Sequence, residues 1–435
     1  MTYEASLLIL NDQSQALARR AGATLELPRV PVESGRVGIS LSRAVRDQLG
    51  LKVFCLVLSG FCESGLYPLR LQSEGAVIPN GYFWAKPSEV IDEETHNPPV
   101  FAEKVGEGRT LGGYSWYSEV QAWLARQVAR LGYRVQFLEQ WNGRVGGVLL
   151  RVVTDGPQFW FKAVSDFNAR EFSIAQLLAG RHPSLFPSVV ASEPGWKALL
   201  LEHVEGTELH ASDDPQVWER VVRVLARMQM QWVGDVSGLL AAGAADLRPV
   251  ALESKIPAFL EHAAEAMARQ SAATPSILQA DELSEIKEQL QELCIETSAL
   301  PIAEGLANAD FSPHNTLITE RGPVFIDWAE ACASMPLIVG EYLWNRMAVE
   351  APERKAWQEG LRTAYLKEWS DVYGADVVGA AARLLPAFAV FAVAVFYHER
   401  EGHGASPYDP YLRSLTRRLQ RELKRLAAEE VTVHA

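Results

Sequence analysis

Three oxygen-bearing side chains in one late segment of the chain have a spacing that suits phosphoryl transfer. Asp310 and Asn315 lie five residues apart, and Asp327 closes an apolar, β-type run seventeen residues after Asp310. Phosphoryl transfer needs a carboxylate that accepts the proton of the acceptor hydroxyl, and oxygen ligands that hold Mg²⁺ against a polyphosphate. We therefore expect Asp310 to be the catalytic base, and Asn315 and Asp327 to bind Mg²⁺. The alternative is an Asx-rich turn between a helix and a hairpin, because Asp and Asn favour turns.

The same segment resembles the catalytic and metal-binding loops of the protein-kinase-like superfamily, most closely those of the aminoglycoside phosphotransferase and small-molecule kinase family. Members usually carry His-Gly-Asp, four further residues, Asn, and later Ile-Asp-Trp, whereas Asn308 and Ala309 replace the His and Gly here. Because an asparagine side chain both donates and accepts hydrogen bonds, we expect Asn308 to fix this loop in place of histidine. The resemblance covers roughly residues 117–435 and implies an α+β, bilobal fold, with a β-rich N-terminal lobe and a helical C-terminal lobe.

A lysine and a glutamate upstream of this segment form a second candidate pair. Lys162 stands near the end of the apolar run Phe159–Ala163, where burial of an ammonium group requires a partner. Glu171 follows nine residues later, early in a predicted helix over 170–178. The resemblance implies that Lys162 binds the α and β phosphates of a nucleotide and that Glu171 positions it. The alternative is a surface lysine at a strand end and a solvated helix carboxylate.

Glycines between two predicted strands, 135–140 and 145–154, could lie close to the phosphates. A glycine has no Cβ, so a turn that contains one allows backbone amides to approach a phosphate group. We expect Gly143, Gly146 and Gly147 to contact the nucleotide in this way. A plain hairpin is the alternative, because the turn has neither a Walker A sequence nor the spacing of a protein-kinase glycine loop.

After further predicted strands at 158–164, 188–192 and 197–201, the chain reaches a segment that resembles an interlobe hinge. The resemblance implies that the backbones of Glu202 and Val204 bind the base of the nucleotide. Beyond it, apolar residues recur at helical spacing. The segments predicted to be helical are 215–232, 259–269, 283–298, 342–348, 356–369, 375–397 and 411–428.

The first 95 residues have the pattern of a small α+β unit. Strands are predicted at 4–10, 24–30 and 52–58, and a helix at 39–49 is followed by Gly50, where a helix C-cap favours glycine. Within it, Arg43–Leu51 resembles the second half of the Nudix box, although Asp47 is the only acidic residue that remains. We expect a Nudix-like fold without Nudix chemistry. An ordinary amphipathic helix is the alternative.

The expected domains follow from these patterns. A polar segment rich in Pro and Gly, Glu93–Gly113, predicts a linker after the first unit. We therefore expect a small domain over 1–95, a linker over 96–115, an N-terminal lobe over 116–204 and a helical lobe over 205–435. A chain of 435 residues is long enough for two or three folding units.

Composition and charge exclude some classes of protein. The net charge of -13 and the isoelectric point near 5.3 disfavour a nucleic-acid binder. The longest apolar run, Pro386–Tyr397, is shorter than the roughly 20 residues that span a bilayer, and the chain starts without a signal-peptide pattern. The four cysteines, Cys55, Cys62, Cys294 and Cys332, form no CxxC pair and are expected to be buried thiols. These features predict a cytoplasmic protein without membrane segments; the oligomeric state stays open.

Together the motifs predict transfer of the γ-phosphoryl group of ATP, or alternatively GTP, to a hydroxyl group of a small molecule. The acceptor stays open between amino-sugar antibiotics, choline, hydroxylated amino acids, sugars and natural products. A nucleotide-binding pseudokinase or regulatory protein without turnover is one alternative. A nucleotide hydrolase that acts through residues 1–95 is another, and this unit could instead recognise substrate or mediate dimerisation.

Overall fold

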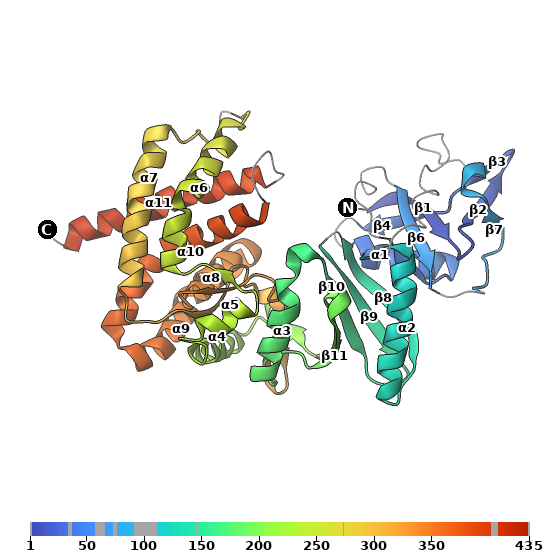
Figure 1. Cartoon of the computed structure of the whole chain (residues 1–435), viewed down its shortest axis with the longest axis horizontal. Helices are drawn as coiled ribbons and strands as arrows, with labels where there is room; N and C mark the ends of the chain where they lie inside the picture. The colour runs from blue at the N-terminus through green and yellow to red at the C-terminus, as the bar shows by residue number, and fades with distance from the viewer. Residues whose placement is uncertain are drawn as a thin grey trace. The chain divides into compact units, whose positions relative to one another are not determined.

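The computed structural model describes residues 2–33, 37–56, 66–72, 76–90, 111–144, 146–272, 274–401 and 408–433. The chain divides into a first unit, Met1–Phe172 with Pro187–His203, and a second unit, Ser173–Phe186 with Val204–Ala435. The first contains two sheets and the second is mainly helical, which confirms the predicted α+β class (Figure 1). The predicted domain limits stay predictions, and most of the predicted linker lies outside the described residues.

The first sheet of the first unit is built around strand β1, Thr2–Leu10. β1 pairs antiparallel with β2 and β4 and parallel with β6. Its last six residues are all buried, which accounts for the continuous apolar run at its end. The prediction of a single strand over 24–30 is wrong. Two strands, β3 and β4, flank Pro28, which has no N–H to donate to a sheet. The other strands are β2 Ala16–Ala21, β3 Thr24–Glu26, β4 Arg29–Glu33, β5 Val53–Cys55, β6 Leu66–Leu71 and β7 Tyr82–Ala85.

The predicted helix of this region is α1, Val37–Leu49. Gly50 ends it with a φ of 67°, a left-handed conformation that favours glycine. Arg43 and Arg46 both pair with Glu139 of the second sheet, at 3.4 and 3.3 Å. Two basic residues of the Nudix-like segment therefore stabilise the packing of α1, and the Nudix-like fold stays a prediction.

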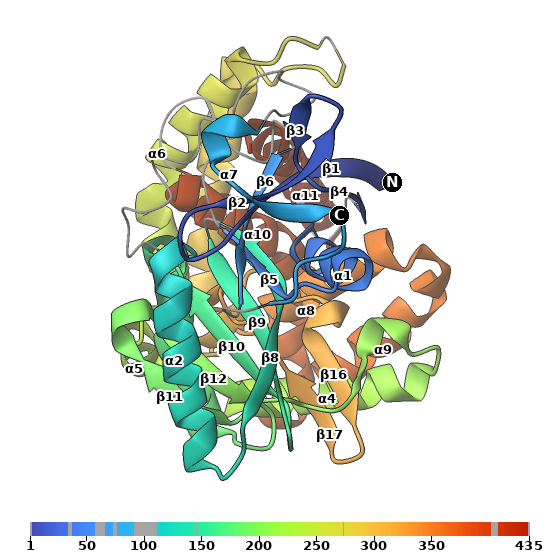
Figure 2. The same ribbon diagram turned by 90° about the vertical axis from the view of Figure 1, so that its right-hand side faces the viewer.

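The second sheet has five antiparallel strands in the order β11-β12-β10-β9-β8. Helix α2, Tyr114–Arg130, lies along it (Figure 2), where Trp116 and Trp123 contact Phe161 of β10. The strands are β8 Val135–Arg144, β9 Gly147–Thr154, β10 Phe159–Val164, β11 Val189–Glu193 and β12 Ala198–Glu202. β8 continues four residues beyond the predicted end of the first strand.

One buried amide joins the two sheets of the first unit. The Gln140 side chain of β8 is 0% exposed; it accepts the Cys55 N–H at 2.6 Å and donates to the Cys55 carbonyl at 3.0 Å. It also donates to the Tyr117 hydroxyl of α2 at 2.9 Å. Buried polar groups are normally hydrogen-bonded, so these three bonds specify how the two sheets dock.

Helices make up most of the second unit (Figure 1). The predicted helix at 259–269 is the second half of a longer helix, α6, which begins at Pro249 because proline suits the first turn of a helix. The helices are α4 Pro215–Met230, α5 Val236–Ala241, α6 Pro249–Ala268, α7 Ala280–Ser298, α8 Ile338–Glu350, α9 Gln358–Tyr373, α10 Ala375–Glu401 and α11 Asp409–Val433. α3, Arg170–Arg181, begins in the first unit and ends in the second.

Helix α10 lies in the core of the second unit and packs against α6, α8, α9 and α11. It is longer than the apolar run that the sequence showed, and over Ala375–Glu399 it is long and apolar enough to cross a membrane by length and composition. However, 67% of its most apolar window is buried among the described residues, as in the core helix of a globular protein. Among the described cysteines, Cys55, Cys294 and Cys332 are buried thiols as predicted.

Candidate active site

The loop that contains Asp310 follows strand β15, Gly305–Asn308, which pairs antiparallel with β18, Ala331–Ser334. The Ala309 N–H continues this pairing with a hydrogen bond to the Glu330 carbonyl at 3.0 Å. Asn308 is 1% exposed; its side-chain oxygen accepts the Asp310 N–H at 2.8 Å, and its amide nitrogen donates to the Asp327 carbonyl at 3.5 Å. The hydrogen bonds expected of Asn308 are therefore present, and one buried side chain connects the backbones of both aspartates.

A hairpin brings Asn315 beside Asp327. The short helix η7, Pro313–Asn315, leads into β16, Thr316–Thr319, which pairs with β17, Gly322–Phe325. The ladder continues one step further, because the Ile326 N–H donates to the Asn315 carbonyl at 2.9 Å. Asn315 thus lies opposite the residue that precedes Asp327, and an amide and a carboxylate, both suitable Mg²⁺ ligands, come from adjacent backbone.

Asp327 has a backbone conformation that its sequence pattern does not predict. The predicted strand ended at Asp327, but β17 ends two residues earlier and Asp327 is exposed with a φ of 59°. A non-glycine residue in the left-handed region is uncommon, and such strained residues cluster at ligand-binding sites. The carboxylate therefore leaves the strand at a sharp turn.

Buried aromatic residues pack together within this loop and hairpin. Phe311, Phe325 and Trp328 are each at most 3% exposed and form one cluster with Phe186. Phe311 and Trp328 directly follow Asp310 and Asp327 in sequence. Each aspartate is consequently held next to a large buried ring, which restricts the movement of its backbone.

Arg346 of α8 pairs with the Asp310 carboxylate and lies 3.5 Å from a Glu350 oxygen. Burial lowers the pKa of the Arg346 guanidinium, but its hydrogen bond to Asp310 and the charges of Asp310 and Glu350 outweigh this and raise the pKa above its ordinary value. No motif in the sequence pointed to Arg346. Its only local signal was the spacing of four between an arginine and a glutamate on one helix face.

Lys162 and Glu171 form an ion pair in the first unit. Lys162 lies on β10 opposite Leu149 and Leu199 of the neighbouring strands, and its side chain is 27% exposed. Glu171, in the first turn of α3, is only 6% exposed. The pair therefore holds a partly accessible ammonium group in a fixed position on the central strand, and its contact with phosphates stays a prediction.

The predicted glycine turn has packing requirements of its own. A Cβ on Gly147 would lie 2.8 Å from the Ala163 carbonyl of the paired strand, and the Gly146 carbonyl accepts a hydrogen bond from the Asn168 side chain at 3.2 Å. Gly143 lies within β8, and residue 145 is outside the described part of the chain. The close approach of β10 explains Gly147 without a ligand, and the phosphate contact stays a prediction for all three glycines.

At the predicted hinge, Glu202 is the last residue of β12, and Val204 begins the second unit. The Glu202 N–H donates to the Ser188 carbonyl at 3.0 Å, and the His203 N–H donates to the Gln158 carbonyl at 3.2 Å. The Glu202 N–H is therefore already engaged within the first unit, and contacts of the Glu202 and Val204 backbones with a nucleotide base stay a prediction.

Comparison with protein families identifies residues 148–375, more than half of the chain, as matching the phosphotransferase enzyme family (APH). No curated protein sequence matches the chain. Among solved structures, an ethanolamine kinase from Plasmodium vivax is 12% identical, with 66% of this chain and 82% of that chain covered and a TM-score of 0.45. A choline kinase from Streptococcus pneumoniae is 14% identical, with coverages of 71% and 99% and a TM-score of 0.46. A type I macrolide 2'-phosphotransferase is 16% identical, with coverages of 71% and 98% and a TM-score of 0.44. These likenesses are distant, so the family match alone carries the assignment.

Proposed function

Because the chain belongs to the phosphotransferase enzyme family, we propose that it transfers the γ-phosphoryl group of ATP to a hydroxyl group of a small molecule. The observation that best supports this proposal is the connection made by Asn308. It holds the backbones of Asp310 and Asp327 together, while the hairpin places Asn315 one step from Asp327. The side chains that we propose as proton acceptor and cation ligands therefore come from one short, well-packed segment.

In the proposed reaction, Asp310 accepts the proton of the acceptor hydroxyl. The hydroxyl oxygen then bonds to the γ-phosphorus, while the bond between the γ-phosphorus and the β-γ bridging oxygen breaks. Asn315 and Asp327 would hold Mg²⁺, which neutralises charge on the phosphates when it is bound. Arg346 would orient the Asp310 carboxylate before the acceptor arrives. Since the transition state of phosphoryl transfer is loose, positioning and charge neutralisation supply most of the acceleration.

Lys162, positioned by Glu171, would bind the α and β phosphates. Gly143, Gly146 and Gly147 would line the phosphates, and the backbones of Glu202 and Val204 would bind the base. GTP is the alternative donor. The acceptor belongs to the small hydroxylated molecules that enzymes of this type phosphorylate, and an amino-sugar antibiotic is one candidate among them.

The test is a phosphate-transfer screen of the full chain with Mg-ATP and Mg-GTP against aminoglycosides and hydroxylated metabolites, with phosphorylated product detected by mass spectrometry. We expect Asp310→Ala and Asp327→Ala each to abolish product formation while circular dichroism stays unchanged. Asp371→Asn, an exposed aspartate that pairs with Lys367 on α9, is the matched control and should retain full activity. Turnover by either active-site variant at the rate of the wild type would overturn the assignment of roles. Nucleotide binding without product from any acceptor would instead favour the pseudokinase alternative.

A further inference from the structure

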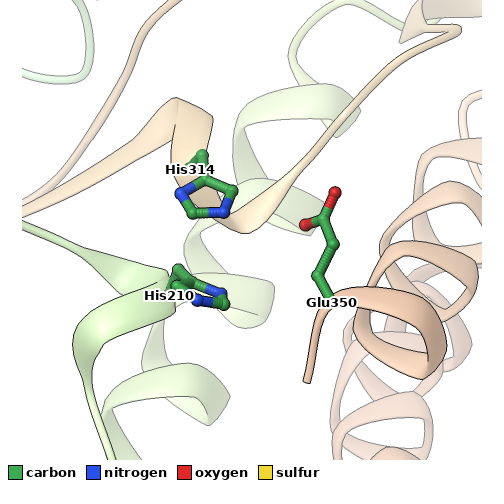
Figure 3. A group of neighbouring side chains, drawn as sticks. All are labelled: His210, His314 and Glu350. Carbon is green, nitrogen blue, oxygen red and sulfur yellow. The ribbon is translucent and has the colours of Figure 1, made fainter. Parts of the chain in front are cut away.

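Outside the residues assigned above, the second unit brings together two imidazole rings and a carboxylate (Figure 3). His210 belongs to the short helix η6, Leu209–Ala211, His314 belongs to η7, and Glu350 is the last residue of α8. One potential ligand atom from each of the three side chains lies within 4.8 Å of the other two. All three residues are half-buried, so the group is shielded but accessible to an ion.

His314 is oriented in the way that metal-binding histidines usually are. Its Nδ1 lies 2.6 Å from a Glu208 carboxylate oxygen. In a neutral imidazole one nitrogen donates and the other accepts, so an Nδ1–H that donates to Glu208 leaves the lone pair on Nε2. A carboxylate that fixes the tautomer and ring orientation of a histidine is the usual outer partner of a metal ligand.

Two further atoms of the group are buried and have no hydrogen-bond partner among the described residues: Nδ1 of His210 and Oε2 of Glu350. The other Glu350 oxygen, Oε1, lies 3.5 Å from a guanidinium nitrogen of Arg346. One carboxylate oxygen is therefore paired, and Oε2 is available to an ion. The His210 ring lies against the His314 ring, with centroids 4.2 Å apart. Buried polar atoms are rarely left without a partner, and a cation between these side chains would satisfy both.

We propose that His210, His314 and Glu350 form a binding site for a divalent transition metal, with Zn²⁺ as the ion that fits best. Two imidazoles and one carboxylate suit Zn²⁺, whereas Mg²⁺ prefers oxygen ligands, so this site differs in chemistry from the one proposed at Asn315 and Asp327. Zn²⁺ bonds of about 2.0–2.1 Å place tetrahedral ligand atoms about 3.4 Å apart. Small side-chain rotations would therefore close the group around the ion.

The position of the group suggests what the ion does. His314 directly precedes Asn315, and Glu350 lies one turn after Arg346, which pairs with Asp310. A bound ion would thus connect the η6 segment, the loop of the proposed catalytic base and the end of α8. It would stabilise this loop in the second unit whether or not a nucleotide is bound.

The test uses the full chain, stripped of metal with a chelator, and isothermal titration with Zn²⁺ alone, without nucleotide or Mg²⁺. We expect one Zn²⁺ per chain, and Co²⁺ in its place should give the visible absorption of a low-coordinate Co²⁺ site. His210→Ala and Glu350→Gln should each weaken Zn²⁺ binding by about 100-fold or more, and Glu208→Ala by about 10-fold to 100-fold.

Two variants identify the site that is titrated. Asp327→Asn should leave Zn²⁺ affinity unchanged, which separates this site from the proposed Mg²⁺ ligands. His398→Asn is the matched control, because His262 and His398 form another imidazole pair, with their Nδ1 atoms 2.8 Å apart. Loss of Zn²⁺ binding in either control, unchanged affinity in His210→Ala and Glu350→Gln, or no binding by the folded wild type would overturn the proposal.

Discussion

The side-chain oxygen of Asn308 accepts a hydrogen bond from the backbone N–H of Asp310 at 2.8 Å, from a position that is 1% exposed. The same side chain donates to the carbonyl of Asp327. A residue with one acceptor and one donor therefore connects the proposed base to the proposed metal ligand. This explains how asparagine can serve where related loops carry histidine.

Replacement of Asn308 should affect both folding and turnover. Asn308→Ala removes the buried acceptor of the Asp310 N–H, so we expect a loss of about 1–3 kcal/mol in the free energy of unfolding. Turnover should fall as well, because Asp310 is no longer fixed; urea unfolding and steady-state kinetics measure the two effects. Asn11→Ala removes similar side-chain bonds from the β1–β2 turn and should lower stability without changing turnover. Equal turnover in both variants would argue against a role for Asn308 in the loop.

The contact between Arg346 and Asp310 should be visible in the pH dependence of activity. A carboxylate beside a cation ionises more readily, so Arg346→Gln should move the acid limb of the kcat/KM profile to higher pH. Arg346→Lys keeps the charge and should restore most of the original profile. Superimposable profiles for wild type and Arg346→Gln would show that the pair does not persist during turnover.

Lys162 and Glu171 should act as one unit in nucleotide use. Lys162→Met removes the ammonium group, and we expect kcat/KM for the nucleotide to fall by about 10²–10³-fold. Glu171→Gln should have a smaller effect, and the double variant should be close to Lys162→Met alone, because the two residues are in contact. Lys197→Met, which removes a lysine that pairs with Asp166, is the control and should keep normal kinetics. If the losses of kcat/KM in the two single variants simply added in the double variant, Glu171 would not act through Lys162.

Glu368 should make the stability of the second unit depend on pH. Hydrogen bonds from Arg227 and also from Arg223 hold the pKa of the Glu368 carboxyl below its ordinary value, although burial opposes them. Its stabilising effect is therefore present above the unfolded pKa of about 4.3 and is lost as the pH falls through the lower folded pKa. Glu368→Gln should lower the free energy of unfolding by about 1 kcal/mol at pH 7, and by progressively less as the pH falls below about 4.

Denaturant unfolding at a series of pH values measures this difference between Glu368→Gln and the wild type. Glu288→Gln, which changes an exposed glutamate of α7, should follow the wild type throughout. A deficit in Glu368→Gln that stays constant down to pH 3 would mean that packing, rather than charge, is responsible.

Gly147 should resist substitution for a steric reason. A Cβ at this position would lie 2.8 Å from the Ala163 carbonyl, so Gly147→Ala should lower the free energy of unfolding by about 1–3 kcal/mol. Gly360 of α9 has open space around its Cβ position, and Gly360→Ala should stabilise the protein by about 0.5–1 kcal/mol. Thermal unfolding distinguishes the two directions, and a neutral Gly147→Ala would show that β9 and β10 can separate at this end.

The sequence alone was sufficient for features whose determinants are close together in the chain. The spacing of Asp310, Asn315 and Asp327 predicted a loop and a hairpin, and the spacing of Lys162 and Glu171 predicted an ion pair, because short separations leave few backbone arrangements. Apolar periodicity predicted most helices for the same reason, since it reflects one face of a single element.

Only the tertiary structure showed that Arg346 contacts Asp310, which is thirty-six residues away in sequence. It also showed that Glu350 lies beside His210 and His314. Apolar burial is non-directional, so the hydrophobic pattern of α8 predicts that the helix packs but not which polar side chain meets which loop. The left-handed conformation of Asp327 was likewise visible only in the structure, where buried aromatic residues flank the turn. Local propensity specified the elements of this protein, and long-range packing decided which of their polar groups meet.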